Sequence, residues 1–358
     1  MSKVGIITYH NGSNYGAALQ AFALQEALKE FCDDVKIINY DNRFISKGLD
    51  RFRFDMSLRG IYYLLSDIVN LKNNTEKINR FHDFFARYYV LSDLMSKDQL
   101  NSTGLPLDVG ISGSDQIWNP LLNKGVDDIY YLNIPGIKKK CSYASSVGSY
   151  KFDNEIYNKQ IINLLSTYTS ISVRENSELI AKSINKEVRN VCDPTLLLTK
   201  DQWGRKLDLS LSRNKYLLIY AMTDFQNITE YAIQIAQKKR LHIKYIGMPV
   251  KKFKNVKYIT NAGPKEFVDL FFNAEYVVTN SFHGTAFSVN FGKQFISLKN
   301  PKNPERATYF LNSINAKNRL VDDYKFFPED MSSAEIYSIH HILSDIVADS
   351  MDYLKTLV

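Results

Sequence analysis

Residue types suited to proton transfer and anion binding follow an apolar run in the second half of the chain. In the segment YVVTNSFHGTAF, the residues Asn280, Ser281 and His283 separate the apolar run from a helical pattern. A protonated imidazole can deliver a proton or hold a phosphate. At a helix start, unpaired backbone N–H groups also attract the phosphate. The alternative is a neutral histidine that only caps the helix.

Two arginines are candidates for binding a carboxylate or phosphate, which guanidinium groups grip through paired hydrogen bonds. Arg174 directly follows the apolar run ISV, and its alternative role is an ion pair with Glu175 or another acid. Arg306 lies near the last strand expected in the second half, with Lys293, Lys299 and Lys302 nearby. A solvated basic rim is the alternative, and it suits the lysines better than Arg306.

Two loops in the first half carry further polar groups. The loop HNGSNYGA separates a strand pattern from a helix pattern, and its candidate residues for an anion or sugar are Asn11, Gly12, Asn14, Tyr15 and Gly16. An ordinary turn with an asparagine cap is the alternative. The loop GSDQIWNP offers groups that suit sugar hydroxyls and a sugar face, namely Gly113, Ser114, Asp115, Gln116, Trp118 and Asn119. Here Asp115 is the candidate base, and the alternative is a turn in which Asp115 caps and Trp118 fills an interface.

Short apolar runs that alternate with helical patterns must position these loops, which predicts an α/β fold with parallel sheets. The strands expected in the first half are residues 3–9, 35–40, 107–112, 140–145, 170–173 and 188–191. Those expected in the second half are residues 216–221, 243–247, 256–259, 276–280 and 294–297. Two doubly wound sheets predict two Rossmann-like domains facing across a cleft, where ligands bind at the carboxyl ends of strands.

The predicted domains are residues 1–205 and 206–332, followed by an amphipathic helix at 333–358. The boundary is placed in the polar segment 199–214. Within the first domain, residues 49–93 are expected to form a helical insertion of two amphipathic helices separated by LKNNTEK. These helices either cover the sheet or face a lipid-linked or polymeric acceptor.

Composition limits the classes of partner. The chain has 45 Lys and Arg residues against 38 Asp and Glu residues, but no long basic block, so a nucleic-acid partner is not expected. Three scattered cysteines, the absence of a secretory signal and the lack of an apolar run of about 18 residues favour the cytoplasm. His and Cys residues are too dispersed to predict a metal site.

Several of these segments together resemble the polysaccharide pyruvyl transferase family. The resemblance extends from near residue 4 to about residue 312 and is carried by NYGAALQAFALQ, SGSDQIWNP, SYASSVG, SVREN, CDPTLLL and TNSFHGTAFSVNFGKQF. It implies a bacterial enzyme with a GT-B-like fold that transfers pyruvate from phosphoenolpyruvate to a sugar of a cell-surface polysaccharide or its lipid-linked precursor. The product would be a cyclic ketal, and no cofactor beyond this co-substrate is implied.

The resemblance also implies roles for individual residues. Arg174, with Arg306, Asn280 and Ser281, would bind the donor, His283 would be the acid or phosphate partner, and Asp115 a base or acceptor ligand. The first domain would hold the acceptor and the second the donor, in the cytoplasm or at the inner face of the membrane. Many relatives carry an arginine two residues before the histidine, where this chain has Ser281, and Arg306 or a lysine would compensate. A nucleotide-sugar glycosyltransferase and a non-catalytic sugar-binding protein remain the alternatives.

Overall fold

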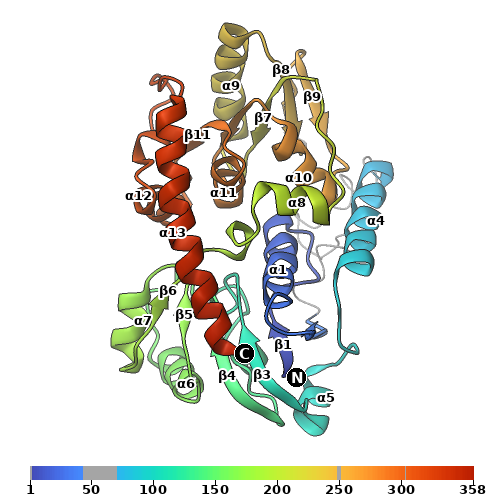
Figure 1. Cartoon of the computed structure of the whole chain (residues 1–358), viewed down its shortest axis with the longest axis vertical. Helices are drawn as coiled ribbons and strands as arrows, with labels where there is room; N and C mark the ends of the chain where they lie inside the picture. Colours follow the sequence, from blue (N-terminus) through green and yellow to red (C-terminus); the bar gives the residue numbers. More distant parts are fainter. Residues whose placement is uncertain (1, 43–70, 248–250, 303) are drawn as a thin grey trace. The chain divides into compact units, whose positions relative to one another are not determined.

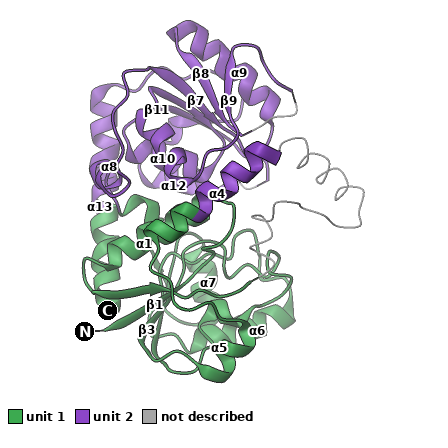
Figure 2. Cartoon of the chain, turned by 90° about the vertical axis from the view of Figure 1, so that its right-hand side faces the viewer, with its two compact units in different colours: residues 1–53, 83–197, 346–358 green, residues 54–82, 198–345 purple. Residues whose placement is uncertain are grey.

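The computed structural model describes residues 2–42, 71–247, 251–302 and 304–358. The chain forms two compact units, coloured separately in Figure 2. Unit 1 comprises residues 1–53, 83–197 and 346–358, and unit 2 comprises residues 54–82 and 198–345. The division falls within two long helices, α4 (Leu71–Tyr88) and α13 (Ser333–Leu357). Unit 1 is therefore assembled from segments far apart in the sequence.

Unit 1 is built on a parallel sheet of four strands in the order β2-β1-β3-β4 (Figure 1). These strands are β1 (Lys3–Ile7), β2 (Asp34–Ile37), β3 (Leu107–Ser112) and β4 (Ile137–Ser142). Parallel bridges from Cys141 to Ser170 and from Ser145 to Val173 lead on to the short pair β5 (Ser172–Val173) and β6 (Arg189–Asn190). The carboxyl ends of β3 to β6 therefore lie in succession along one edge.

The helices of unit 1 are α1 (Tyr15–Leu28), α5 (Lys97–Thr103), α6 (Glu155–Ser166) and α7 (Ser177–Ile184), with the short 3₁₀ helices η2 (Asp128–Tyr131) and η3 (Pro194–Leu196). Helix α1 is rich in alanine and leucine, which favour helix, and nearly all of its residues are buried. Asn14 fixes its start, because the side-chain oxygen accepts hydrogen bonds from the N–H groups of Gly16 and Ala17. The buried helix thus holds the loop after β1 against the centre of the unit.

Unit 2 contains a parallel sheet of six strands in the order β12-β11-β10-β7-β8-β9. These strands are β7 (Tyr216–Tyr220), β8 (His242–Ile246), β9 (Val256–Ile259), β10 (Tyr276–Thr279), β11 (Gln294–Leu298) and β12 (Leu320–Val321). Its further helices are α8 (Lys200–Lys206), α9 (Phe225–Lys239), α10 (Pro264–Asn273), α11 (Phe282–Asn290), α12 (Glu305–Ser313) and η4 (Lys317–Arg319). The fully apolar runs of β7 and β10 occupy the centre of this sheet, as buried parallel strands do.

The structure confirms the predicted α/β class, with two Rossmann-like units and a C-terminal helix. Some boundaries differ from the predicted ones. The main segment of unit 2 begins at residue 198 instead of 206, residues 54–82 belong to unit 2 and not to the first domain, and residues 346–358 of the last helix belong to unit 1. The polar segment 199–214 contains α8, whose start is fixed by a capping box between Thr199 and Gln202.

The predicted helical insertion at 49–93 lies outside the described residues up to position 70. The segment LKNNTEK is expected to separate two helices. In the described part of the chain it instead forms the first turns of α4. It lacks Gly and Pro, so nothing in the segment ends the helix, and its residues are exposed or half-buried. None of the helices in the described ranges has both the length and the hydropathy of a membrane span.

Candidate active site

Polar side chains of unit 1 meet where strands β3 to β6 end. Asp115 follows β3, Ser146 follows β4, Arg174 follows β5 and Asp193 follows β6. Parallel bridges from Ser145 to both Asp115 and Val173 hold the first three loops side by side. Ligands of parallel α/β folds bind at this edge of the sheet, which makes the cluster a candidate site.

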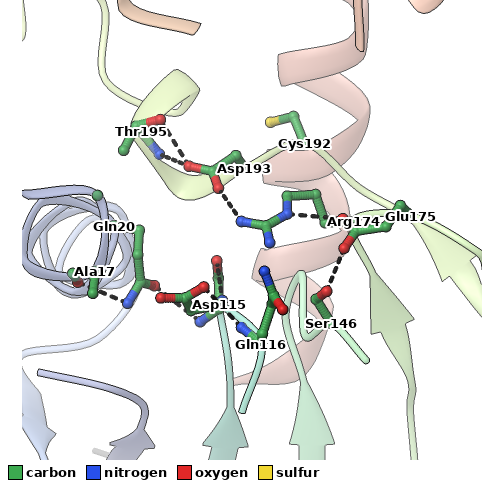
Figure 3. A network of polar contacts seen from close by, with 12 residues as sticks. Ala17, Gln20, Asp115, Gln116, Ser146, Arg174, Glu175, Cys192, Asp193 and Thr195 are labelled. Atoms are coloured by element: carbon green, nitrogen blue, oxygen red, sulfur yellow. Dashed lines mark hydrogen bonds and ion pairs between the residues drawn. The ribbon is translucent and has the colours of Figure 1, made fainter. Parts of the chain in front are cut away.

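Arg174 is the centre of this cluster (Figure 3). The side chain is 4% exposed, and its Nε donates to Glu175 Oε2 at 2.8 Å while Nη1 donates to Asp193 Oδ2 at 2.7 Å. Burial lowers the pKa of the guanidinium, but nearby Glu175, Asp193 and Asp115 outweigh this effect and raise it. The arginine therefore stays charged, and the expected alternative of an ion pair with Glu175 is present in the structure.

The two acids are held in turn by neighbouring hydroxyl and N–H groups. Ser146 Oγ donates a short hydrogen bond to Glu175, and Asp193 Oδ1 accepts bonds from the Thr195 N–H and Oγ1 at 3.0 and 2.7 Å. Both carboxylates are buried beside the Arg174 guanidinium. The cluster thus fixes the plane of the guanidinium.

Asp115 and Gln116 form the side of the site that comes from β3. Asp115 Oδ1 accepts a hydrogen bond from the Gln116 N–H at 2.8 Å, and the Asp115 carbonyl accepts one from the Ser146 N–H at 3.0 Å. Gln116 Oε1 accepts a bond from Asn119 Nδ2 at 3.1 Å. Gly148 makes room for this amide, because its φ is 59° and a Cβ there would collide with Gln116 Oε1.

Three non-glycine residues with positive φ lie around the cluster: Asp115 at 77°, Ala144 at 52° and Asn176 at 62°. Alanine rarely adopts this conformation, since its Cβ crowds the following carbonyl. Such residues persist where the surroundings impose them, and they gather at functional sites. The strained loops after β3, β4 and β5 therefore support a role for this edge in binding.

The loop after β1 is linked to the site through hydrogen bonds of α1, and Asn14 accepts hydrogen bonds from two N–H groups that could have bound a phosphate. Gln20 Nε2 donates to Thr8 Oγ1 and Oε1 accepts from the Ser114 N–H at 3.1 Å, which ties α1 to the loop after β3. The N–H groups of Gly16 and Ala17 are taken by Asn14 Oδ1 at 2.8 and 3.3 Å. The capped turn that was the alternative is thus present, while binding by Asn11, Tyr15 or this loop stays a prediction.

The role predicted for Trp118, stacking on a sugar face, needs correction. The residue is 1% exposed, and its ring is stacked on Tyr131 with centroids 5.6 Å apart. Its Nε1 donates to the Tyr130 carbonyl at 3.2 Å. Trp118 is therefore a core residue that anchors the loop carrying Asp115, because a large aromatic ring gains most from complete burial.

In unit 2, the predicted segment around His283 lies between β10 and α11. Ser281 is the N-cap of α11, and its Oγ accepts a hydrogen bond from the Gly284 N–H at 3.4 Å. His283 is buried in the first turn, with its ring 5.2 Å from that of Phe282. Asn280 joins this loop to the one after β7, since Oδ1 accepts from the Met222 N–H at 2.7 Å and Nδ2 donates to Thr223.

Arg306 comes from α12 to the same place. Its guanidinium carbon lies 4.6 Å from the centre of the Phe282 ring, a cation–π arrangement next to His283. The structure therefore brings together four residues that sequence reasoning had singled out: Asn280, Ser281, His283 and Arg306. It places the Arg306 cation over Phe282, the residue between Ser281 and His283.

A family model for polysaccharide pyruvyl transferases matches residues 14–303. The chain belongs to the polysaccharide pyruvyl transferase family. The matched range includes the Arg174 cluster and His283, whereas Arg306 lies just beyond its end. No curated protein matches the sequence of this pyruvyl transferase significantly.

Solved structures similar to this pyruvyl transferase have low sequence identity. The S. aureus MnaA–UDP co-structure is 12% identical in sequence and gives a TM-score of 0.49. The alignment covers 96% of this chain and 88% of the MnaA chain. A putative UDP-N-acetylglucosamine 2-epimerase from Listeria monocytogenes is 12% identical, with coverages of 100% and 92% and a TM-score of 0.48. E. coli heptosyltransferase WaaC with ADP-2-deoxy-2-fluoro heptose is 11% identical, with coverages of 84% and 90% and a TM-score of 0.40. Nothing about substrate follows from these likenesses.

Several residues of the pyruvyl transferase site carried no individual signal in the sequence. Gln20, Ser146 and Thr195 reach the cluster through hydrogen bonds that only the fold creates. Asp193 could have been found from the run Asp-Pro-Thr, because an acid before proline commonly caps a short helix, as it caps η3. No group of three or more His, Cys, Asp or Glu residues in the described ranges is arranged to hold a metal ion.

The stability of the protein is expected to depend on pH through the protonation of His10, which lies shortly after β1. Its ring is buried, with Nδ1 3.2 Å from the Thr8 carbonyl and Nε2 3.0 Å from Asn39 Oδ1. Burial lowers the pKa of His10 in the folded state, so the unfolded chain binds the proton more readily. Stability should be complete above about pH 6.5 and should fall below it, by at most about 1.4 kcal/mol per pH unit.

Urea unfolding of the wild type and the His10→Gln variant between pH 5 and 8 measures this effect. The variant should lose part of the pH slope, and His341→Gln, which changes a largely exposed histidine, should keep it. An identical slope in the His10→Gln variant and the wild type would refute the assignment.

Proposed function

We propose that this chain transfers the pyruvyl group of phosphoenolpyruvate to two hydroxyls of one sugar, as a cyclic ketal, and releases phosphate. The methylene carbon takes a proton, the central carbon forms bonds to two sugar oxygens, and its bond to the phosphate oxygen breaks. Of the two protons that the hydroxyls lose, one is accounted for in the new methyl group and the other in the released phosphate. The family match over residues 14–303 is the observation that carries this proposal.

In this proposal His283 gives the proton to the methylene carbon or holds the phosphate. Its support is its place in the first turn of α11, next to Phe282, whose ring is in contact with the Arg306 guanidinium. A helix start and a cation both favour a bound dianion, and a bound dianion favours a protonated imidazole. Asn280 and Ser281 would shape the donor pocket from the same loop.

Arg174 is assigned to the donor and Asp115 to the acceptor, as the resemblance implies. The family match supports the first assignment, while the ion pairs with Glu175 and Asp193 engage Nε and Nη1 and fix the orientation of the guanidinium. The carboxylate of Asp115 is suited to accept the proton of an attacking hydroxyl. The proposal requires no cofactor, and it places the enzyme in the cytoplasm or at the inner membrane face, where lipid-linked precursors are available.

The proposal is tested by measuring phosphate release from phosphoenolpyruvate in the presence of candidate glycans. The product should gain the mass of one pyruvate less one water and should return pyruvate on mild acid hydrolysis. Thermal shift with phosphoenolpyruvate against UDP- and ADP-sugars screens the donors first. Stabilisation by a nucleotide sugar alone would favour a glycosyltransferase, and binding of glycans without phosphate release would favour a sugar-binding protein.

Arg306→Ala is expected to raise the KM for phosphoenolpyruvate roughly ten-fold or more while changing kcat less. A charge-assisted hydrogen bond to the donor contributes about 1.5–3 kcal/mol, and this variant would lose it. Steady-state phosphate release at varied phosphoenolpyruvate measures the effect. Arg306→Lys should recover part of the affinity, and Lys302→Ala is the control for a general loss of positive charge. An unchanged KM in Arg306→Ala would exclude Arg306 from donor binding.

A further inference from the structure

Unit 2 contains a cavity that is remote from His283 and has a volume of about 430 Å³. It lies between the last turns of α9 and residues 327–330, over the strands β10 and β11. Tyr276, the first residue of β10, lines it, whereas His283 follows the opposite end of that strand. The length of β10, roughly 10 Å, therefore separates the cavity from the proposed donor residues.

The cavity has an apolar floor and an aromatic wall. Ile235 and Ile296 are buried beneath it, and Tyr276 presents its ring to the Lys239 ammonium 5.0 Å away. The wall is the ring of Phe327, one face of which is stacked on Tyr231 with centroids 4.6 Å apart. Phe327 nevertheless remains 40% exposed as a residue, which leaves an aromatic surface for a ligand.

This wall is held in place by contacts that surround it. The Glu329 carbonyl accepts a hydrogen bond from Arg319 Nη1 at 2.8 Å, and Asp330 forms an ion pair with Lys239. The backbone of the next residue, Met331, forms two hydrogen bonds of 2.8 Å with the Gln294 side chain: its N–H donates to Oε1 and its carbonyl accepts from Nε2. A cavity whose wall is fixed in this way is preformed, so a ligand would not have to pay for ordering it.

The polar rim indicates the chemical class of the ligand. Two lysines, Lys238 and Lys239, face two acids, Glu329 and Asp330, and Gln234 adds an amide. These charges balance, so the rim offers no net attraction for an anion or a cation, but it provides many hydrogen-bond donors and acceptors. An aromatic face beside planar amide and carboxylate groups suits a neutral ligand that has a flat apolar face and several hydroxyls.

We infer that this cavity is a saccharide-binding site, distinct from the site of pyruvyl transfer, that holds a neutral sugar unit against Phe327. The ligand class rests on the proposed function, in which the acceptor is a sugar. Such a site would hold a remote part of a long acceptor, and would therefore favour polymers over single sugars. An apolar lipid carrier is the competing ligand, because the floor of the cavity is aliphatic.

The test uses the full chain without phosphoenolpyruvate and a panel of neutral trisaccharides of glucose, galactose, mannose and N-acetylglucosamine. Binding is measured by saturation-transfer NMR and titration calorimetry. At least one trisaccharide should bind, and Phe327→Ala should weaken it roughly ten-fold, the worth of an aromatic stacking contact. Gln234→Ala, on the exposed side of α9, should also weaken it. Phe326→Ala is the matched control, since this neighbouring ring is 58% exposed and does not line the cavity.

A short polyprenyl phosphate is titrated as the competing ligand. Three results would overturn the inference: no trisaccharide binds, both Phe327→Ala and Gln234→Ala bind as the wild type does, or only the polyprenyl phosphate binds in a Phe327-dependent way. Thermal unfolding of Phe327→Ala checks that the wall persists, and Gln234→Ala keeps the test decisive if it does not. Because binding is measured without the donor, a failure of phosphate release and a failure of this site are separate results.

Discussion

Replacement of Arg174 by alanine is expected to abolish phosphate release and to lower the free energy of unfolding by about 3–5 kcal/mol. Two buried carboxylates, those of Glu175 and Asp193, form ion pairs with this guanidinium. Its removal takes this buried counter-charge away, which costs far more than the loss of an exposed ion pair. The sequence alone predicts loss of activity with the fold intact, and the buried contacts add a loss of stability.

Urea unfolding, followed by circular dichroism, measures this effect. Arg189→Ala is the matched control, because its ion pair with Asp349 is largely exposed and should contribute about 1 kcal/mol or less. Adding Asp193→Asn to Arg174→Ala should restore part of the stability without restoring activity, since it removes one buried negative charge. Wild-type stability in Arg174→Ala would show that the cluster does not depend on the arginine.

Replacement of His283 by glutamine is expected to reduce the rate of pyruvyl transfer by about 10²–10⁴-fold, the usual contribution of a general acid. Glutamine fills a similar volume and can hydrogen-bond, but it cannot deliver a proton. If His283 is the acid, kcat falls while the KM for phosphoenolpyruvate changes little. If it holds the phosphate instead, the KM rises and kcat is less affected.

Phosphate release at varied phosphoenolpyruvate separates these two roles. His341→Gln makes the same chemical change at a side chain that is 65% exposed on α13, and it should behave as the wild type does. Melting temperatures of both variants show whether the fold is kept. A His283→Gln enzyme with normal kcat and KM would remove this histidine from the reaction.

The sequence predicts the strands well because most of them are buried on both faces. The ranges predicted for β3 and β9 coincide with the observed ones, and the fully buried strands β7 and β10 lie within their predicted ranges. Strand β4 begins three residues before the predicted start, because Lys138 and Lys139 hide it, and it also ends three residues earlier. Lys138 donates to Asp108 and Lys139 donates to carbonyls at the end of α13, so a charged segment can still be a strand.

The candidate site is predictable only in part. Motifs identify the loops that carry Asp115, Arg174 and His283, because each follows the end of an apolar strand. They do not show that Arg174 pairs with Asp193, which lies 19 residues further along the chain. Nor do they distinguish an exposed aromatic residue from a core one, and Trp118 was misassigned for that reason. Both properties depend on which strands become neighbours.

The last turns of α13 have a consequence for the order in which the protein can mature. Ser350 Oγ accepts a hydrogen bond from the Cys192 N–H, next to Asp193, and Tyr353 OH donates to the Ser142 carbonyl at the end of β4. A ribosome makes residues 346–358 roughly 150 residues after Asp193 (at about 5–20 residues per second). The neighbourhood of the buried guanidinium therefore stays incomplete until residues 346–358 have been made and have packed onto unit 1.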